Sequence, residues 1–458
     1  MSVTDFFMNL PEVEKPIKKV SLNNKLMWTG IVLVLYFVMS VLPLYGLSKN
    51  YVSQFESLSI LLAASFGSVI TLGIGPLVTG SIMLQLLTGA GIVKIDMHSS
   101  EGKKKYQGLQ KLFSIFFVIF ENGIYVVSGA LPTAYPSTFL EILLILQLTL
   151  GGLILMLLDE VSSKWGVGSG ISLFIAAGVS REIVVKGFSP IFSMDAPIGA
   201  IPQIIYFLSK GETYKIMTPF LSILATIIIF IMAIYFSGVQ VNIPLSFGKV
   251  RGFGIKWPIK WFYTSNIPVI LTAALMASIQ FWAVTLSGFG IDILGKFEVR
   301  NELGKQVKVP ISGIAYWIHN PSLTAVFQNG FNPTALIALL FYAGFMIIGA
   351  IIFAYLWLNV GKASPSDVAD QILSSGLSIP GFRRDKRILE KVLERYIVPL
   401  TILGGFTVGV LALVADLLGA LSRGTGILLS VMIIYQFYEQ IQKAHMEEMS
   451  PLIGKILG

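Results

Sequence analysis

The chain alternates between long apolar runs and short polar segments, and this pattern predicts a helical membrane protein. Ten runs are nearly free of charge and close to the length of about 20 residues that a membrane-spanning helix needs. These runs cover residues 26–45, 72–93, 108–131, 138–158, 166–189, 216–237, 267–291, 333–358, 397–418 and 424–442. We therefore predict an all-α polytopic membrane protein with ten transmembrane helices.

One stretch departs from this pattern, because no ionisable residue occurs between Glu56 and Lys94. At about 1.5 Å per residue, a single helix would exceed the hydrocarbon core of about 30 Å, yet two spans and a turn would need more residues. The helix-breaking sequence Leu72-Gly73-Ile74-Gly75-Pro76 stands near its middle. We expect a re-entrant helix over residues 58–70 and a spanning helix over residues 72–93. Lipid cannot satisfy the ends of a re-entrant helix, so this piece would lie in a pore.

Composition supports the membrane assignment and narrows the chemistry. The chain has 54% hydrophobic and 13% charged residues, with a mean hydropathy of +0.77. It has no cysteine, which excludes a disulfide, a thiolate metal site and a cysteine nucleophile. No phosphate-binding loop, zinc signature or catalytic triad pattern is present in the sequence. We therefore predict a protein that is not an enzyme and has no catalytic residue, cofactor or metal.

The distribution of basic residues predicts the orientation in the membrane. If the N-terminus is cytoplasmic, 23 of the 33 lysines and arginines fall in cytoplasmic segments and ten on the other side. Basic residues are retained on the cytoplasmic side, so both termini are predicted to be cytoplasmic, in a multi-pass protein of the cell membrane. The charges before the first apolar run also argue against a cleaved signal peptide of the usual design.

A short phrase occurs twice, five spans apart. The fifth span opens with Gly168-Ser169-Gly170-Ile171, and the tenth opens with Gly424-Thr425-Gly426-Ile427. An acidic residue precedes each phrase at a similar distance, Asp159 in one case and Asp416 in the other. Because five is odd, the two copies would enter the membrane from opposite faces, as in inverted-topology halves. We expect halves over residues 1–190 and 191–458; chance recurrence of a glycine phrase is the alternative.

Inverted halves suit both transporters and channels, so charged residues inside the spans have to discriminate between them. A carrier keeps ionisable groups near the middle of the membrane for binding. Here they are few: Glu121 in the third span and Arg181 with Glu182 near the end of the fifth. Glu121 could also serve only to bond a neighbouring helix. A channel, a secondary transporter with a saturable solute site and a structural scaffold all stay open at this point.

Three phrases in order resemble the SecY protein-conducting channel family, the alpha subunit of the Sec translocon, in its archaeal form. They are Thr71-Leu72-Gly73-Ile74-Gly75-Pro76, Gly166-Val167-Gly168-Ser169-Gly170-Ile171 and Ser265-Asn266-Ile267-Pro268-Val269-Ile270. The resemblance spans essentially the whole chain. It implies two inverted-topology halves of five helices, with the re-entrant helix as a plug. It also implies passive passage of unfolded secretory polypeptides and lateral release of transmembrane segments into lipid.

The resemblance assigns residues to the pore. The implied ring of apolar side chains is Ile74, Val78, Ile171, Ile175, Ile270 and Leu429. The implied plug and hinge are Leu58, Ile60, Leu61, Phe66, Gly67, Gly73, Gly75 and Pro76. A dewetted constriction of branched aliphatic groups would block ions while yielding to a polypeptide.

The resemblance also implies a lateral gate and a set of partners. The gate residues would be Gln85, Ser278 and Gln280; many family members have Asn in place of Ser278, so the strength of the gate contact is left open. Cytoplasmic loops 238–263 and 359–396 would contact the ribosome through Lys249, Arg251, Lys256, Arg383 and Arg384, although these charges could also serve only to fix topology. Further expected partners are SecE-like and SecG/Sec-beta-like small membrane subunits, signal sequences, nascent polypeptides and the lipid bilayer.

Overall fold

Each of the ten apolar runs contains a helix. The computed structural model describes residues 12–18, 20–48, 67–89, 92–93, 95, 100–127, 129, 131–193, 196–247, 254–264, 267–288, 290–302, 305–319, 333–360, 363–374, 377–378, 385–422 and 424–457. The ten helices are α2 (Leu22–Val41), α4 (Gly75–Gly89), α5 (Ser100–Val127), α6 (Thr138–Trp165), α7 (Gly170–Phe188), α9 (Thr213–Gly238), α10 (Ile267–Gly288), α13 (Pro333–Val360), α15 (Lys386–Leu417) and α16 (Gly424–Leu457).

Within the described residues, six helices are long and apolar enough to cross a membrane. They are α2, α5, α6, α9, α13 and α15. Helix α4 has only 15 residues, or about 22 Å of helix, and it begins three residues later than expected. The chain is thus a multi-pass helical membrane protein, and the count of ten spans stays a prediction.

The expectation of an all-α fold was incomplete, because short antiparallel sheets form between the helices. Strands β3 (Gln240–Phe247) and β4 (Gly254–Lys260) form a hairpin, and β7 (Leu377–Ser378) adds to β3. Two further hairpins are β1 (Phe192–Ser193) with β2 (Ala196–Pro197) and β5 (Phe297–Glu302) with β6 (Lys305–Pro310). Alternating apolar residues such as Val241 and Ile243 favour a strand with one buried face, and Ile243 is 3% exposed.

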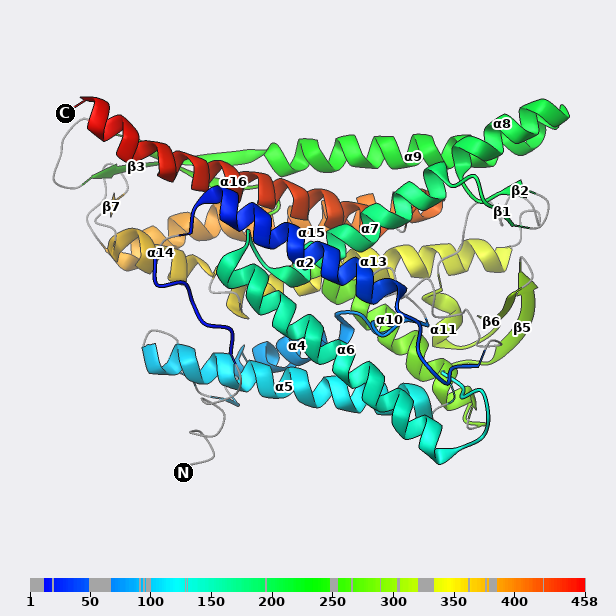
Figure 1. Cartoon of the computed structure of the whole chain (residues 1–458). Helices are drawn as coiled ribbons and strands as arrows, with labels where there is room; N and C mark the ends of the chain where they lie inside the picture. The colour runs from blue at the N-terminus through cyan, green and yellow to red at the C-terminus, as the bar shows by residue number, and fades with distance from the viewer. Residues whose placement is uncertain are drawn as a thin grey trace. The chain divides into compact units, whose positions relative to one another are not determined.

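The chain divides into two compact units, each with its own packed core. The first unit is Met1–Val185, Ala283–Ile311 and Ile433–Gly458; the second is Lys186–Trp282 and Ser312–Met432. In the first unit α4 lies beside α5, and α6 contacts α5 and α2 (Figure 1). In the second unit α15 packs along α13 and also contacts α9. The expected division at residue 190 stays a prediction about repeats.

Among the described residues, three short helices of the second unit precede its longer ones. Helix α8 (Ala200–Lys210) precedes α9, α11 (Ile314–Trp317) precedes α13, and α14 (Pro365–Ser374) precedes α15. Helix α14 joins the hairpin to the helical core, because its buried Ile372 belongs to one cluster with Ile243 of β3 and Leu393 of α15.

Glycines bring neighbouring helices into close contact. A Cβ atom at Gly405 or Gly409 of α15 would lie 3.0 Å from main-chain atoms of α13. In the first unit, a Cβ atom at Gly80 of α4 would lie 2.8 Å from the main-chain nitrogen of Ser114 in α5. Lipid chains are as apolar as leucine, so membrane helices associate mainly through such close packing.

Candidate functional site

The turn before α4 is joined to the end of α2 by main-chain hydrogen bonds. The N–H of Leu44 donates to the Gly67 carbonyl at 2.9 Å, and the N–H of Val69 donates to the Leu42 carbonyl at 3.0 Å. Pro43 and Ser68 form an antiparallel bridge between these two bonds. Residues 67–70 were expected to end the re-entrant helix; this was wrong, because Gly67 and Val69 bond to the chain after α2 and the next residues form turns. Leu58, Ile60, Leu61 and Phe66 lie outside the described residues.

The predicted hinge is a run of tight turns. The N–H groups of Thr71, Gly73 and Gly75 donate to carbonyls three residues earlier, at 2.9–3.2 Å. Gly67 has φ 81° and Gly73 has φ 55°, a left-handed conformation that favours glycine. Helix α4 then begins at Gly75, with Pro76 in its first turn, where the missing N–H breaks no helical bond.

The hinge packs tightly against α6. A Cβ atom at Gly151 would lie 2.2 Å from the carbonyl oxygen of Val69 and 2.8 Å from its Cγ1 atom. The neighbouring Ile70 is 1% exposed and Thr71 is 2% exposed. The helix-breaking sequence therefore forms a buried, hydrogen-bonded part of the first unit.

The apolar residues of the predicted ring are distributed over both units. In the first unit Ile74 is 1% exposed and Ile175 is 3% exposed, while Val78 and Ile171 are half-buried. In the second unit Leu429 is 1% exposed. Ile270 lies on α10 with a side chain outside the described set. The arrangement of these residues in one ring stays a prediction.

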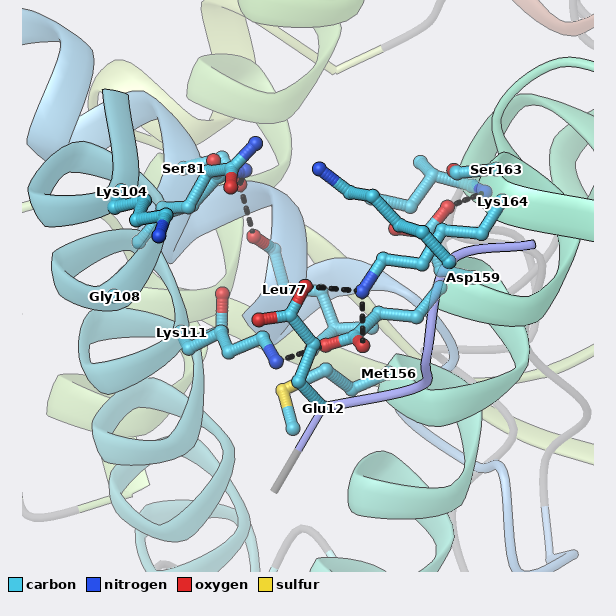
Figure 2. A pocket seen from close by; sticks show the side chains of 16 residues that line it. Glu12, Leu77, Ser81, Lys104, Gly108, Lys111, Met156, Asp159, Ser163 and Lys164 are labelled. Atoms are coloured by element: carbon cyan, nitrogen blue, oxygen red, sulfur yellow. Dashed lines mark hydrogen bonds and ion pairs between the residues drawn. The ribbon is translucent and has the colours of Figure 1, made fainter. Parts of the chain in front are cut away.

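A pocket of about 420 Å³ lies in the first unit, between the N-terminal segment and helices α4, α5, α6 and α7 (Figure 2). Its apolar lining includes Leu77, Met156 and Ile171. Its polar lining comes from α5, with Lys104 and Gln107 among others, and from α4, α6 and the N-terminal segment. Ile171, which is a predicted ring residue, therefore lies in the same pocket as several charged side chains.

An ionic network lines this pocket, and Figure 2 shows its members converging from three segments. Lys111 of α5 lies 2.5 Å from Oε1 of Glu160 in α6. Lys164, one turn further along α6, lies 3.4 Å from the other oxygen of Glu160 and also pairs with Glu12 of the N-terminal segment. Both lysines and Glu160 are largely buried, with side-chain exposures of 12–16%. The network therefore joins α5, α6 and the N-terminal segment.

The N-terminal segment is held on the end of α6 by this network and by its main chain. The N–H of Val13 donates to Glu160 Oε2 at 3.0 Å, and Lys164 Nζ donates to the Val13 carbonyl at 2.7 Å. The indole N–H of Trp165 donates to the carbonyl of Glu14 at 2.9 Å. The hydrogen bond from Lys164 lowers the pKa of Glu12 below its ordinary value. The sequence reasoning missed this contact, because its partners are about 150 residues apart.

Two further charged positions noted in the sequence have neighbours within the first unit. Arg181 Nη1 donates to the Ser40 hydroxyl of α2 at 3.1 Å, and the adjacent Glu182 is 8% exposed. Glu121 of α5 lies beside the Thr79 hydroxyl of α4. These contacts favour the bonding of neighbouring helices over a solute site.

Of the predicted gate residues, the structure describes one side chain. Gln280 Nε2 donates to the main-chain carbonyl of Ile318, directly after α11, at 3.1 Å. The side chains of Gln85 and Ser278 lie outside the described set. This bond lies within the second unit, and the role of Gln280 in the gate stays a prediction.

The first of the two loops predicted to contact the ribosome, residues 238–263, contains the hairpin of β3 and β4. Lys256 lies on β4 opposite Pro244 and is exposed. Lys249, Arg251, Arg383 and Arg384 lie outside the described residues. At the base of the hairpin, the Tyr263 hydroxyl donates to the Ala363 carbonyl at 2.8 Å. Burial, with a smaller effect of Asp367, raises the pKa of Tyr263 to about 12.

Comparison with known sequences identifies the family. The sequence model described as SecY matches residues 68–438, and the one described as the plug domain of Sec61p matches residues 34–67. The protein translocase subunit SecY of Methanothermobacter thermautotrophicus is 44% identical, over 99% of this chain and 97% of that protein. The protein of the same name from Pyrococcus furiosus is 41% identical, over 98% of this chain and 97% of that protein.

Solved structures agree. One described as "The structure of a protein conducting channel" has a TM-score of 0.82 and 39% identity, covering 99% of this chain and 100% of that chain. Sec61 in the canine ribosome–channel complex from the endoplasmic reticulum has a TM-score of 0.79 and 38% identity, with the same coverage. The match to the plug domain ends at residue 67, and the described residues of the hinge begin at the same position. The chain therefore belongs to the SecY family and is a protein-conducting translocase channel rather than an enzyme.

Proposed function

We propose that unfolded polypeptide crosses the membrane through a ring of apolar side chains in this channel, and that a plug at residues 58–66 closes the ring from one side. The observation that carries the proposal is the buried hinge, which joins the plug domain match to Ile74 and then to the helix that bears Val78. The proposed ring is Ile74, Val78, Ile171, Ile175, Ile270 and Leu429.

An apolar ring has a physical advantage over a polar one. A narrow passage lined by isobutyl and isopropyl groups expels water and so blocks ions, yet these groups can move aside for a chain. The burial of Ile74, Ile175 and Leu429 supports a closed, dry constriction. A secondary transporter would instead need a binding site for a small solute, and the described contacts of Glu121 and Arg181 do not favour one.

The proposed topology has ten spans in two inverted halves, with both termini in the cytoplasm. This orientation places the basic hairpin of β3 and β4 in the cytoplasm. Lys256 is exposed there, and ribosome binding through this loop and through residues 383–384 agrees with the likeness to ribosome-bound Sec61. Clustered lysine and arginine would neutralise RNA phosphates. Small SecE-like and SecG/Sec-beta-like subunits complete the proposed assembly.

The proposed lateral gate lies between the second and third spans on one side and the seventh and eighth on the other. Gln280, with Gln85 and Ser278, belongs to it. The bond from Gln280 to the Ile318 carbonyl supports a weak polar contact on the seventh span. Side-chain hydrogen bonds between the helices of the gate would contribute only about 0.6 kcal/mol each on average, so the gate would part at modest cost.

The experiment that tests the ring is site-specific crosslinking to a stalled secretory chain. The chain has no cysteine, so single-cysteine variants at Ile171, Ile175 and Ile270 start without background. We expect crosslinks from all three positions. The matched control is cysteine at Phe174, which lies on the same helix but stacks on Tyr36 of α2 at 4.9 Å. Absence of crosslinks at every ring position, with the stalled chain engaged, would contradict the ring.

A further inference from the structure

Asp159 of α6 binds the start of α7. Its Oδ1 atom accepts the N–H of Ile171 at 2.9 Å and the hydroxyl of Ser169 at 3.1 Å. The first N–H groups of a helix have no partner within the helix, so an acceptor from outside satisfies one of them. A Cβ atom at Gly170 would lie 2.6 Å from the Asp159 Cα atom, and glycine is what permits this approach.

Asp416 of α15 does the same for α16. Its Oδ1 atom accepts the N–H of Gly424, the first residue of α16, at 2.6 Å. Its Oδ2 atom accepts the hydroxyl of Tyr342, on α13, at 2.6 Å. A Cβ atom at Gly424 would lie 2.2 Å from the Ala412 carbonyl oxygen. The start of α16 therefore also needs a glycine for its close contact with the preceding helix.

These two helix starts are the repeated phrases of the sequence, and each helix carries proposed ring residues. Ile171, whose N–H binds Asp159, is itself one of them, and Ile175 follows one turn later. On α16, Leu429 follows Gly424 by five residues. A change in where either helix begins would therefore rotate or shift a ring side chain.

We infer that Asp159 and Asp416 are positioning residues that fix the starts of α7 and α16 and thereby hold the ring side chains in the closed channel. The inference rests on the proposed ring. A negative group at the N-terminus of a helix also interacts favourably with the helix dipole. Without the acceptor, the freed N–H groups would seek other partners and the first turn would loosen.

Resting ion conductance of the reconstituted channel tests this inference. We expect Asp159→Ala and Asp416→Ala each to raise the resting current by roughly fivefold or more, since loss of a helix cap changes a two-state equilibrium by about that factor. Asp159→Asn and Asp416→Asn retain a side-chain oxygen acceptor and should restore most of the seal. A purely electrostatic role would make the asparagine variants as leaky as the alanine variants, and would overturn the inference.

Two controls separate positioning from general damage. Asp385→Ala removes the same kind of cap from α15, where Asp385 Oδ1 accepts the N–H of Arg387 at 2.9 Å, but α15 carries no proposed ring residue. Its resting current should match wild type. Ile175→Ser and Leu429→Ser test the ring directly. If the two serine variants raise the resting current while both aspartate-to-alanine variants match wild type, the positioning inference is overturned. If the serine variants also match wild type, the ring proposal itself is contradicted.

Discussion

The two helix starts that share a repeated phrase are built differently. At α7, Asp159 is half-buried, lines the polar pocket and lies next to Glu160 of the ionic network. At α16, Asp416 is 6% exposed and binds a tyrosine hydroxyl from a third helix. The glycine that contacts the preceding helix also differs, being the third residue of the first phrase and the first residue of the second.

This difference separates what the repeat requires from what each copy adds. Both copies need an acid at the end of the preceding helix and a glycine at the contact. The first copy adds charged neighbours that can exchange bonds with water in the pocket. The second adds a buried hydrogen bond that links α13, α15 and α16, so the loss of its acid leaves groups that water reaches poorly.

The largest loss of stability is expected for the Asp416→Ala variant. Asp416→Ala leaves both the Gly424 N–H and the Tyr342 hydroxyl without this acceptor, and a buried unsatisfied group costs about 1–3 kcal/mol. Asp159→Ala should cost less, since water in the pocket can replace the lost acceptor. Thermal unfolding of the purified protein in one detergent compares the two. Equal losses of stability would mean that burial does not distinguish the copies.

The next largest losses of stability are expected for alanine at the two glycines that contact the preceding helix, Gly424 and Gly170. In Gly424→Ala the new Cβ atom would lie 2.2 Å from a carbonyl oxygen and 2.6 Å from the Ala415 Cβ atom, so the backbone must move. We expect a loss of about 1–3 kcal/mol from overpacking, and a somewhat smaller loss for Gly170→Ala. Gly344→Ala, on α13 with no atom within 4 Å of its Cβ position, is the matched control. Thermal unfolding should leave that control at or above wild-type stability.

Tyr342→Phe tests the link that only the second copy has. It removes a 2.6 Å hydrogen bond to Asp416 and nothing from the first copy, so we expect a loss of about 1 kcal/mol. Combined with Asp416→Ala, the tyrosine change should add little, because both variants break the same bond. A double-mutant cycle by thermal unfolding measures this coupling. Fully additive losses would show that the two residues act independently.

Much of this organisation was predictable from the sequence, for reasons that particular residues make clear. Apolar runs predicted the positions of ten helices but not those of the short helices α8, α11 and α14, because only a helix that crosses the membrane needs a long apolar run. The glycines and proline at 73–76 predicted the break before α4, since they disfavour a continuous helix. The pairing of an acid with each repeated phrase was also visible, although its role as a helix cap was not.

What the sequence did not reveal depends on contacts between distant residues. The bridge between Pro43 and Ser68 places residues 67–70 outside a helix, because main-chain groups of Gly67 and Val69 bond to the chain after α2. Tyr342 and Asp416 are 74 residues apart, and no local pattern directs one side chain to the other. The strands β3 and β4 lie in a loop whose short alternating pattern of apolar residues was overlooked in the sequence.

The smallest expected effect concerns the ionic network beside the first copy. Glu12 is 48% exposed, so its pair with Lys164 should contribute less than about 1 kcal/mol. We expect Glu12→Gln to increase protease cleavage within residues 12–18 while the resting current stays unchanged. Glu14→Gln is the control, because Glu14 binds Trp165 through its main-chain carbonyl.

The pH dependence of cleavage tests the same contact. The pKa of Glu12 is lowered in the folded protein, so its stabilising contribution is present above the unfolded-state pKa and is lost as the pH falls through the folded-state pKa. Protection of the segment in wild type should therefore fall at acidic pH towards the level of Glu12→Gln, whereas the variant should vary less. If both proteins lost protection in parallel, the pH dependence would not come from Glu12, and its role in holding residues 12–18 on α6 would be contradicted.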